Sequence, residues 1–141
     1  MSYRTNISAF LPNGPSNPLL NAYRILVAIE LALKDIGCTG GHDIPSMLAQ
    51  LANQHPTLAG QLVGHQSKLS TDLRQLTCNS PKGPPAAVLS NNYPHARYTR
   101  IAGDWNGVSE TPLRAISALE QTCYSLLGHL QSHKNVFGIN L

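Results

Sequence analysis

Aromatic and basic side chains are concentrated in one stretch of the chain, residues 93–105, which opens with Tyr-Pro-His-Ala-Arg-Tyr-Thr-Arg. The side chains in it that can do chemistry are Tyr93, His95, Arg97, Tyr98 and Arg100, followed by Trp105. Aromatic faces stack on bases, and guanidinium groups hold phosphate or carboxylate through paired hydrogen bonds. This mixture favours an anionic, planar ligand such as a nucleotide. A structural interpretation stays open, in which the rings anchor a long loop and Arg97 pairs with a helix carboxylate such as Glu30.

Charged residues in the apolar stretch that begins near residue 19 form the second candidate group. Glu30 and Lys34 stand four residues apart, and charges in such surroundings are costly unless paired. They either pair with each other or line a pocket with Arg97. His42 stands just before a short predicted helix, whose free backbone amides can receive an anion. Capping of that helix by Asp43 explains the same residues without a ligand.

The remaining histidines and the cysteines give no pattern of a metal site or a catalytic centre. His129 and His133 are four apart and can share a helix face, but no HExxH sequence includes them. His65 lies on a stripe of leucines, which is typical of a core histidine. The cysteines are Cys38, Cys78 and Cys123, an odd number at wide intervals that fits no zinc-site spacing; pairing of two of them stays open. We therefore expect reduced thiols, no metal, no cofactor and no catalytic residues.

The composition indicates a folded single domain with few charges. Of the 141 residues 42% are hydrophobic and 12% charged, with a net charge of +3, whereas about 25% charged residues is usual. So few charges exclude a polybasic nucleic-acid binder. The longest apolar run, 25–33, is interrupted by Glu30 and is shorter than the ~20 residues that span a bilayer. With no secretory signal at the N-terminus, the expected location is cytoplasmic.

Four helices are predicted to position these side chains. The first is capped by Asn17 and runs to residue 36, the second begins at Asp43 and ends before Pro56, and the third covers 57–77. The last begins at Ser109 or Thr111 and continues to about 133. Its predicted inward face comprises Leu113, Ile116, Leu119, Cys123, Leu126, Leu127 and Leu130. The predicted fold is an all-α, up-and-down bundle of four main helices, with a long structured loop between the third and fourth. We assign an irregular arm to 1–16, the bundle to 17–135 and a tail to 136–141.

In order along the chain, these features resemble the HEPN domain, a nucleotide-binding family of small helical bundles. The matching parts are 22–34 of the first helix, 41–48 at the start of the second, the leucine-striped third helix, the Tyr-Pro-His-Ala-Arg-Tyr segment and the long last helix. The resemblance implies a homodimer that binds a nucleotide or RNA, in some cases beside a nucleotidyltransferase in toxin–antitoxin or defence modules. Many members are ribonucleases with an Arg, four to six residues, then a His. No Arg in this chain has a His at that distance.

We therefore expect a non-catalytic, HEPN-like domain that binds a nucleotide, RNA or a partner protein. Its expected binding residues are Glu30, Lys34, His42, Tyr93, His95, Arg97, Tyr98 and Arg100. One alternative is a divergent, metal-independent ribonuclease that uses His95 or His42 with Arg97 or Arg100. The other is a purely structural, dimeric assembly subunit.

Overall fold

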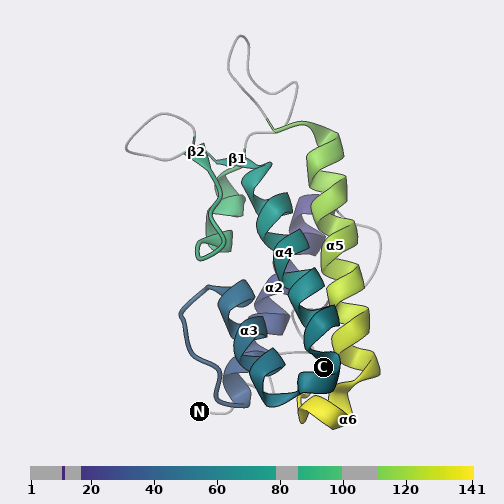
Figure 1. Cartoon of the computed structure of the whole chain (residues 1–141). Coiled ribbons are helices and arrows are strands. Elements are labelled where there is room, and N and C mark those ends of the chain that lie inside the picture. Colours follow the sequence, from purple (N-terminus) through teal and green to yellow (C-terminus); the bar gives the residue numbers. More distant parts are fainter. Residues whose placement is uncertain (1–10, 12–16, 79–85, 100–110) are drawn as a thin grey trace, which may run out of the picture.

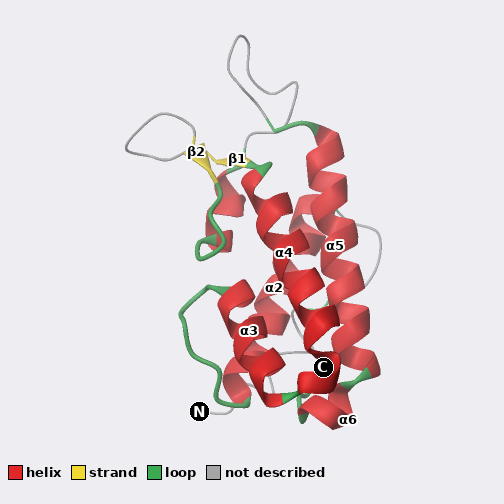
Figure 2. Ribbon diagram, viewed as in Figure 1, coloured by secondary structure: helices red, strands yellow, loops and turns green. Residues whose placement is uncertain are grey.

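The protein is an all-α bundle in the computed structural model, which describes residues 11, 17–78, 86–99 and 111–141. Within these residues the long helices are α2 (Pro18–Asp35), α3 (Ile44–Gln54), α4 (Ala59–Arg74) and α5 (Leu113–Ser132). Figures 1 and 2 show α4 and α5 side by side and antiparallel, with α3 against α4 and α2 behind them. The predicted all-α bundle of four main helices is confirmed.

Two helices begin where the sequence places a capping residue. The Asn17 side chain accepts hydrogen bonds from the backbone amides of Leu19 (2.9 Å) and Leu20 (3.3 Å) at the start of α2. The Asp43 carboxylate accepts from the amide of Ser46 (3.1 Å) at the start of α3. These bonds satisfy amides that have no partner inside the helix. After α2, Gly37 turns the chain with a φ of +97°, which favours glycine.

The core lies where the four helices meet. Fully buried side chains include Ile25, Leu26, Ile29, Leu33, Met47, Leu48, Leu62, Leu69, Leu73, Leu119 and Leu126. The leucine stripe of α4 points into this core, as helical periodicity predicts. Leu113 is an exception on α5, because its side chain is 61% exposed. It opens the helix at the outer end of the bundle (Figure 1), so its assignment to the inward face was wrong.

The long connection between α4 and α5 carries structure of its own, as predicted. Strands β1 (Thr77–Cys78) and β2 (Ala86–Ala87) pair antiparallel, and Cys78 also forms a bridge with Thr99. The 3₁₀ helix η2 (Tyr93–Tyr98) follows and packs against α2. Strands this short show no alternation of apolar and polar residues, so the pairing was not predicted.

The chain ends with a short helical segment at the lower end of the bundle (Figure 1). The 3₁₀ helix η1 (Pro56–Leu58) joins α3 to α4 at this end, and α6 (Lys134–Phe137) follows α5. Phe137 and Ile139 are buried in the core. Within the described residues, no helix combines the length and the apolar character that crossing a membrane requires.

Candidate functional site

Glu30 is a buried carboxylate with two basic partners. Its side chain is 8% exposed; Oε2 lies 3.3 Å from Lys34 Nζ and Oε1 lies 2.7 Å from His42 Nδ1. An ionised carboxylate only accepts hydrogen bonds, so both nitrogens donate. The predicted pair between Glu30 and Lys34 is therefore confirmed. In the neutral form of His42, the hydrogen lies on Nδ1 and leaves Nε2 as an acceptor.

The connection between α2 and α3 brings His42 to this carboxylate. Glu30 lies five residues before Asp35, the end of α2, so the chain must fold back along the helix to reach it. Gly40 and Gly41 allow the reversal with φ values of +128° and +64°. The amide of Asp43 donates to the carbonyl of Gly40 (3.0 Å) and closes the turn. The sequence also suggested that the start of α3, beside His42, binds an anion. The structure explains these residues without an anion, because Asp43 caps the helix and His42 contacts Glu30.

Tyr93 closes the same cluster from η2. It is 2% exposed, and its hydroxyl forms a hydrogen bond with Glu30. Burial, together with the neighbouring carboxylate, raises the pKa of Tyr93 well above its usual range. Its ring centroid lies 6.0 Å from that of Tyr23 and 5.8 Å from that of His42. Tyr93 therefore fixes η2 to α2 and to the 36–43 connection at once.

Arg97 lies on the outer side of η2, over two aromatic rings. Its Cζ is 5.9 Å from the centroid of Tyr23 and 5.5 Å from that of Tyr98, within cation–π range. Its Nε donates to the carbonyl of Pro94 (3.0 Å). Within the described part of the chain, no carboxylate lies in ion-pair distance of this guanidinium. The alternative in which Arg97 pairs with Glu30 is wrong, because Lys34, His42 and Tyr93 take that role.

A pocket of about 250 Å³ opens beside this arginine, between the start of α2 and η2. Its walls are mostly apolar, and its lining residues are Asn17, Leu19, Leu20, Tyr23, Ala96 and Arg97. Leu20, one of the lining residues, is 46% exposed. The pocket thus joins an apolar wall, an aromatic ring and one cation.

The predicted binding residues fall into two adjoining groups. Glu30, Lys34, His42 and Tyr93 form a cluster around the buried Glu30 carboxylate, and Tyr23 links them to Arg97 and Tyr98. His95 is exposed, with its ring 6.5 Å from that of Tyr98. Arg100 and Trp105 lie outside the described residues.

Sequence reasoning did not single out Tyr23 or Leu20 as pocket residues. The sequence did carry a signal for them, because a helix that is apolar on all sides must place some large side chains away from the core. The pattern alone does not show which other element packs against those side chains.

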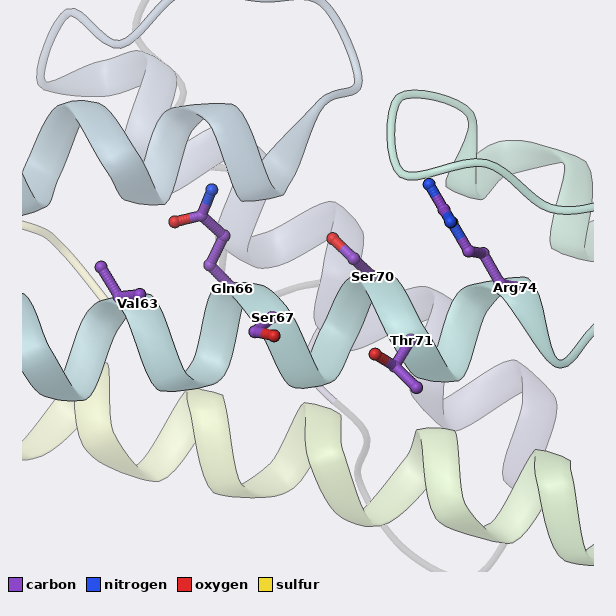
Figure 3. Close-up of a pocket in the computed structure, with 6 residues that line it drawn as sticks. All are labelled: Val63, Gln66, Ser67, Ser70, Thr71 and Arg74. Carbon is purple, nitrogen blue, oxygen red and sulfur yellow. The ribbon is translucent and has the colours of Figure 1, made fainter.

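Two other hollows lie along α4. The larger, about 370 Å³, runs along its outer face and is lined by Val63, Gln66, Ser67, Ser70, Thr71 and Arg74. Figure 3 shows all six side chains on this one helix, with Gln66 and Arg74 directed toward the segments above it. The second, about 330 Å³, lies between α4 and α5 and includes His65, Lys68 and Thr122. Neither has a Tyr, Phe or Trp in its lining, whereas the Arg97 pocket has Tyr23.

A group of histidines lies at the end of the bundle where α4 begins and α5 ends. The His129 ring lies 4.6 Å from that of His133 and 5.0 Å from that of His65, measured between centroids. Over the described ranges, no group of three or more His, Cys, Asp or Glu side chains is arranged to hold a metal ion. The cysteines are all free and buried, and burial raises the pKa of Cys38 and Cys123.

No protein-family model, curated protein or solved structure matches this chain. The resemblance to the HEPN family therefore remains a prediction from the sequence.

Proposed function

We propose that the protein is a binding module for a nucleotide or for RNA, without catalytic activity, and that its ligand occupies the pocket beside Arg97. The observation that carries this proposal is the guanidinium held over Tyr23 and Tyr98, with no carboxylate partner among the described residues. Such a cation is free to meet a phosphate at the rim of an apolar pocket.

The size of the pocket favours a base inside and phosphates outside. At about 250 Å³ it is smaller than the roughly 300 Å³ at which pockets for drug-sized ligands begin. A flat base can lie against Tyr23 and the leucines of α2, since base–aromatic stacking contributes about 1–3 kcal/mol. The phosphate then lies near Arg97. A single cation gives weak affinity, which is in line with the low net charge of +3.

The Glu30 cluster, which consists of Glu30, Lys34, His42 and Tyr93, supports this pocket through Tyr23. Tyr93 contacts Tyr23 on one side and is held by Glu30 on the other. Lys34 and His42 complete the hydrogen bonding of the carboxylate. The cluster therefore holds η2, and with it Arg97, against α2. This assigns Glu30, Lys34, His42 and Tyr93 to positioning rather than to direct ligand contact.

Titration calorimetry with AMP, ATP, inorganic phosphate and an oligo(A) RNA tests this proposal. We expect ATP and the RNA to bind more tightly than phosphate alone, because the base contributes. Arg97→Met keeps the aliphatic stem and should weaken ATP binding about tenfold or more, the effect of losing one charged hydrogen bond of ~1.5–3 kcal/mol. Arg114→Met, at the exposed Arg114 of α5, is the matched control and should bind like the wild type. Equal affinities for Arg97→Met and the wild type would overturn the proposal.

A second candidate, a divergent ribonuclease, is favoured by one contact. Glu30 holds Nδ1 of His42 at 2.7 Å, and the His42 side chain is 53% exposed. A carboxylate on one ring nitrogen with the other ring nitrogen free is the arrangement of a general base. Incubation with RNA, comparing the wild type with His42→Gln, separates the candidates. Cleavage that His42→Gln abolishes would favour the enzyme, and no cleavage by either protein favours the binding module.

Self-association and a nucleotidyltransferase partner belong to the same proposal. Large apolar side chains are exposed on several elements, among them Leu20, Tyr98, Leu113 and Tyr124. We propose that a homodimer interface covers some of these side chains. The buried, free cysteines agree with a reducing, cytoplasmic location. Sedimentation velocity of the purified chain is the test of the dimer, and a monomer at high concentration would contradict it.

A further inference from the structure

Three histidine rings form a stack between α4 and α5 at the foot of the bundle. His129 lies in the middle, 5.0 Å from His65 on α4 and 4.6 Å from His133 at the end of α5, between centroids. Phe137 of α6 closes the stack, with its ring 6.1 Å from His129 and 6.0 Å from His133. Side chains from three successive parts of the fold therefore meet in one small volume.

The surroundings favour the neutral forms of His65 and His129. Nε2 of His129 is buried and has no hydrogen-bond partner. Nδ1 of His133 lies 3.0 Å from the His129 carbonyl and must donate to it, because a carbonyl only accepts. Burial lowers the pKa of His65 and of His129, and the two neighbouring histidines lower the pKa of His129 further.

In the part of the chain that the structure describes, no acidic side chain forms an ion pair with these rings. On α4, Lys68 follows His65 and is held by the Asp72 carboxylate (3.1 Å), which itself also accepts from Thr122. On α5, Glu120 accepts from Asn21 at 3.0 Å, nine residues before His129. Lys134 of α6 and His55, whose ring lies 5.1 Å from Phe137, add only positive or neutral groups. A proton on His129 is therefore repelled and poorly solvated.

The stack also holds the end of the chain. Phe137 and Ile139 are 5% and 6% exposed, and Leu141 packs against Ala28 and Ala32 of α2. His133 stands between α5 and α6 and its ring lies 6.0 Å from that of Phe137, so it connects the stack to this segment.

We propose that the stack of His65, His129 and His133 is an acid-sensitive latch, in which protonation of His129 and His65 in mildly acidic solution releases residues 134–141 from the bundle and uncovers the Ala28–Ala32 face of α2. The direction follows from linkage. Because the folded form lowers the pKa of His65 and His129 and the released form no longer buries them, the released form binds more protons. The segment is held fully above the ordinary histidine pKa of 6.5 and loses its hold as the pH falls below it.

Hydrogen–deuterium exchange of the intact protein at pH 7.5 and 5.5 tests the latch, with rates corrected by an unstructured reference peptide. We expect protection of 134–141 to fall several-fold at pH 5.5 in the wild type, while the middle of α5 stays protected. His129→Phe keeps a ring against Phe137 and removes the central titrating group, so its protection should depend much less on pH than that of the wild type. His95→Phe is the control, since His95 is exposed on η2, and should respond like the wild type.

His65→Gln provides a second variant that removes a flanking ring, in case His129→Phe does not fold, and should reduce the response to pH. Protection of 134–141 that is independent of pH in the wild type would overturn the proposal. An unchanged pH response in His129→Phe, or in His65→Gln if His129→Phe is unfolded, would overturn it as well.

Discussion

Replacement of Glu30 by glutamine should destabilise the protein by about 2–3 kcal/mol. The variant keeps the volume of the side chain but turns one of its two acceptors into a donor. The hydroxyl of Tyr93, a residue that is 2% exposed, then loses its acceptor. A buried hydroxyl without a partner costs about 1–3 kcal/mol. The bonds to Lys34 and His42 contribute less, since these side chains are 25% and 53% exposed and their charges are screened. Most of the predicted loss therefore comes from Tyr93.

Urea unfolding of a double-mutant cycle measures this directly. We expect Tyr93→Phe to cost about 1 kcal/mol, the net value of one hydrogen bond. The double variant with Glu30→Gln should lose about 1 kcal/mol less unfolding free energy than the sum of the two single variants. The reason is that the hydrogen bond shared by the two residues can be lost only once. Glu120→Gln, whose carboxylate accepts one bond from Asn21, is the control and should cost less than Glu30→Gln. Additive effects of Glu30→Gln and Tyr93→Phe would refute the argument that Glu30 holds η2 through Tyr93.

Two further predictions concern a helix cap and the thiols. Asp43→Ala should lower the free energy of unfolding by about 1 kcal/mol, because the amide of Ser46 loses its partner; a change below ~0.3 kcal/mol in urea unfolding would contradict the capping role. Cys38, Cys78 and Cys123 are buried, and burial raises the pKa of Cys38 and Cys123, so Ellman's reagent at pH 8 should label the native protein slowly and the urea-unfolded protein at once. Rapid labelling of the native protein would show that the core opens more easily than its packing implies.

The four main helices could be predicted from the sequence because their signals are local. Asn17 and Asp43 cap α2 and α3 as expected, and Pro56 follows the end of α3 within two residues. The leucines of α4 repeat at helical spacing and are buried. Leu113 shows the limit of periodicity, since it fits the inward register of α5 but lies where the bundle ends.

The candidate site could be predicted only in part, because its geometry depends on chain reversals. The Glu30–Lys34 pair follows from a spacing of four residues, whereas the contact of His42 with Glu30 depends on how the 36–43 connection folds back. Tyr93 and Tyr23 are far apart in the chain, and only the packing of η2 on α2 brings them together. The histidine stack was missed for the same reason. His129 and His133 were visible as an i,i+4 pair, but His65 joins them from another helix.

The most direct test of the proposed binding site is an amide NMR titration of the ¹⁵N-labelled protein with ATP. We predict that shift changes concentrate at the start of α2 and in η2, around Leu20, Tyr23 and Arg97, and that α6 stays unaffected. Arg97→Met should reduce these changes at the same ATP concentration. Shift changes confined to the outer face of α4, around Gln66 and Arg74, or no changes at millimolar ATP and with RNA, would contradict the account.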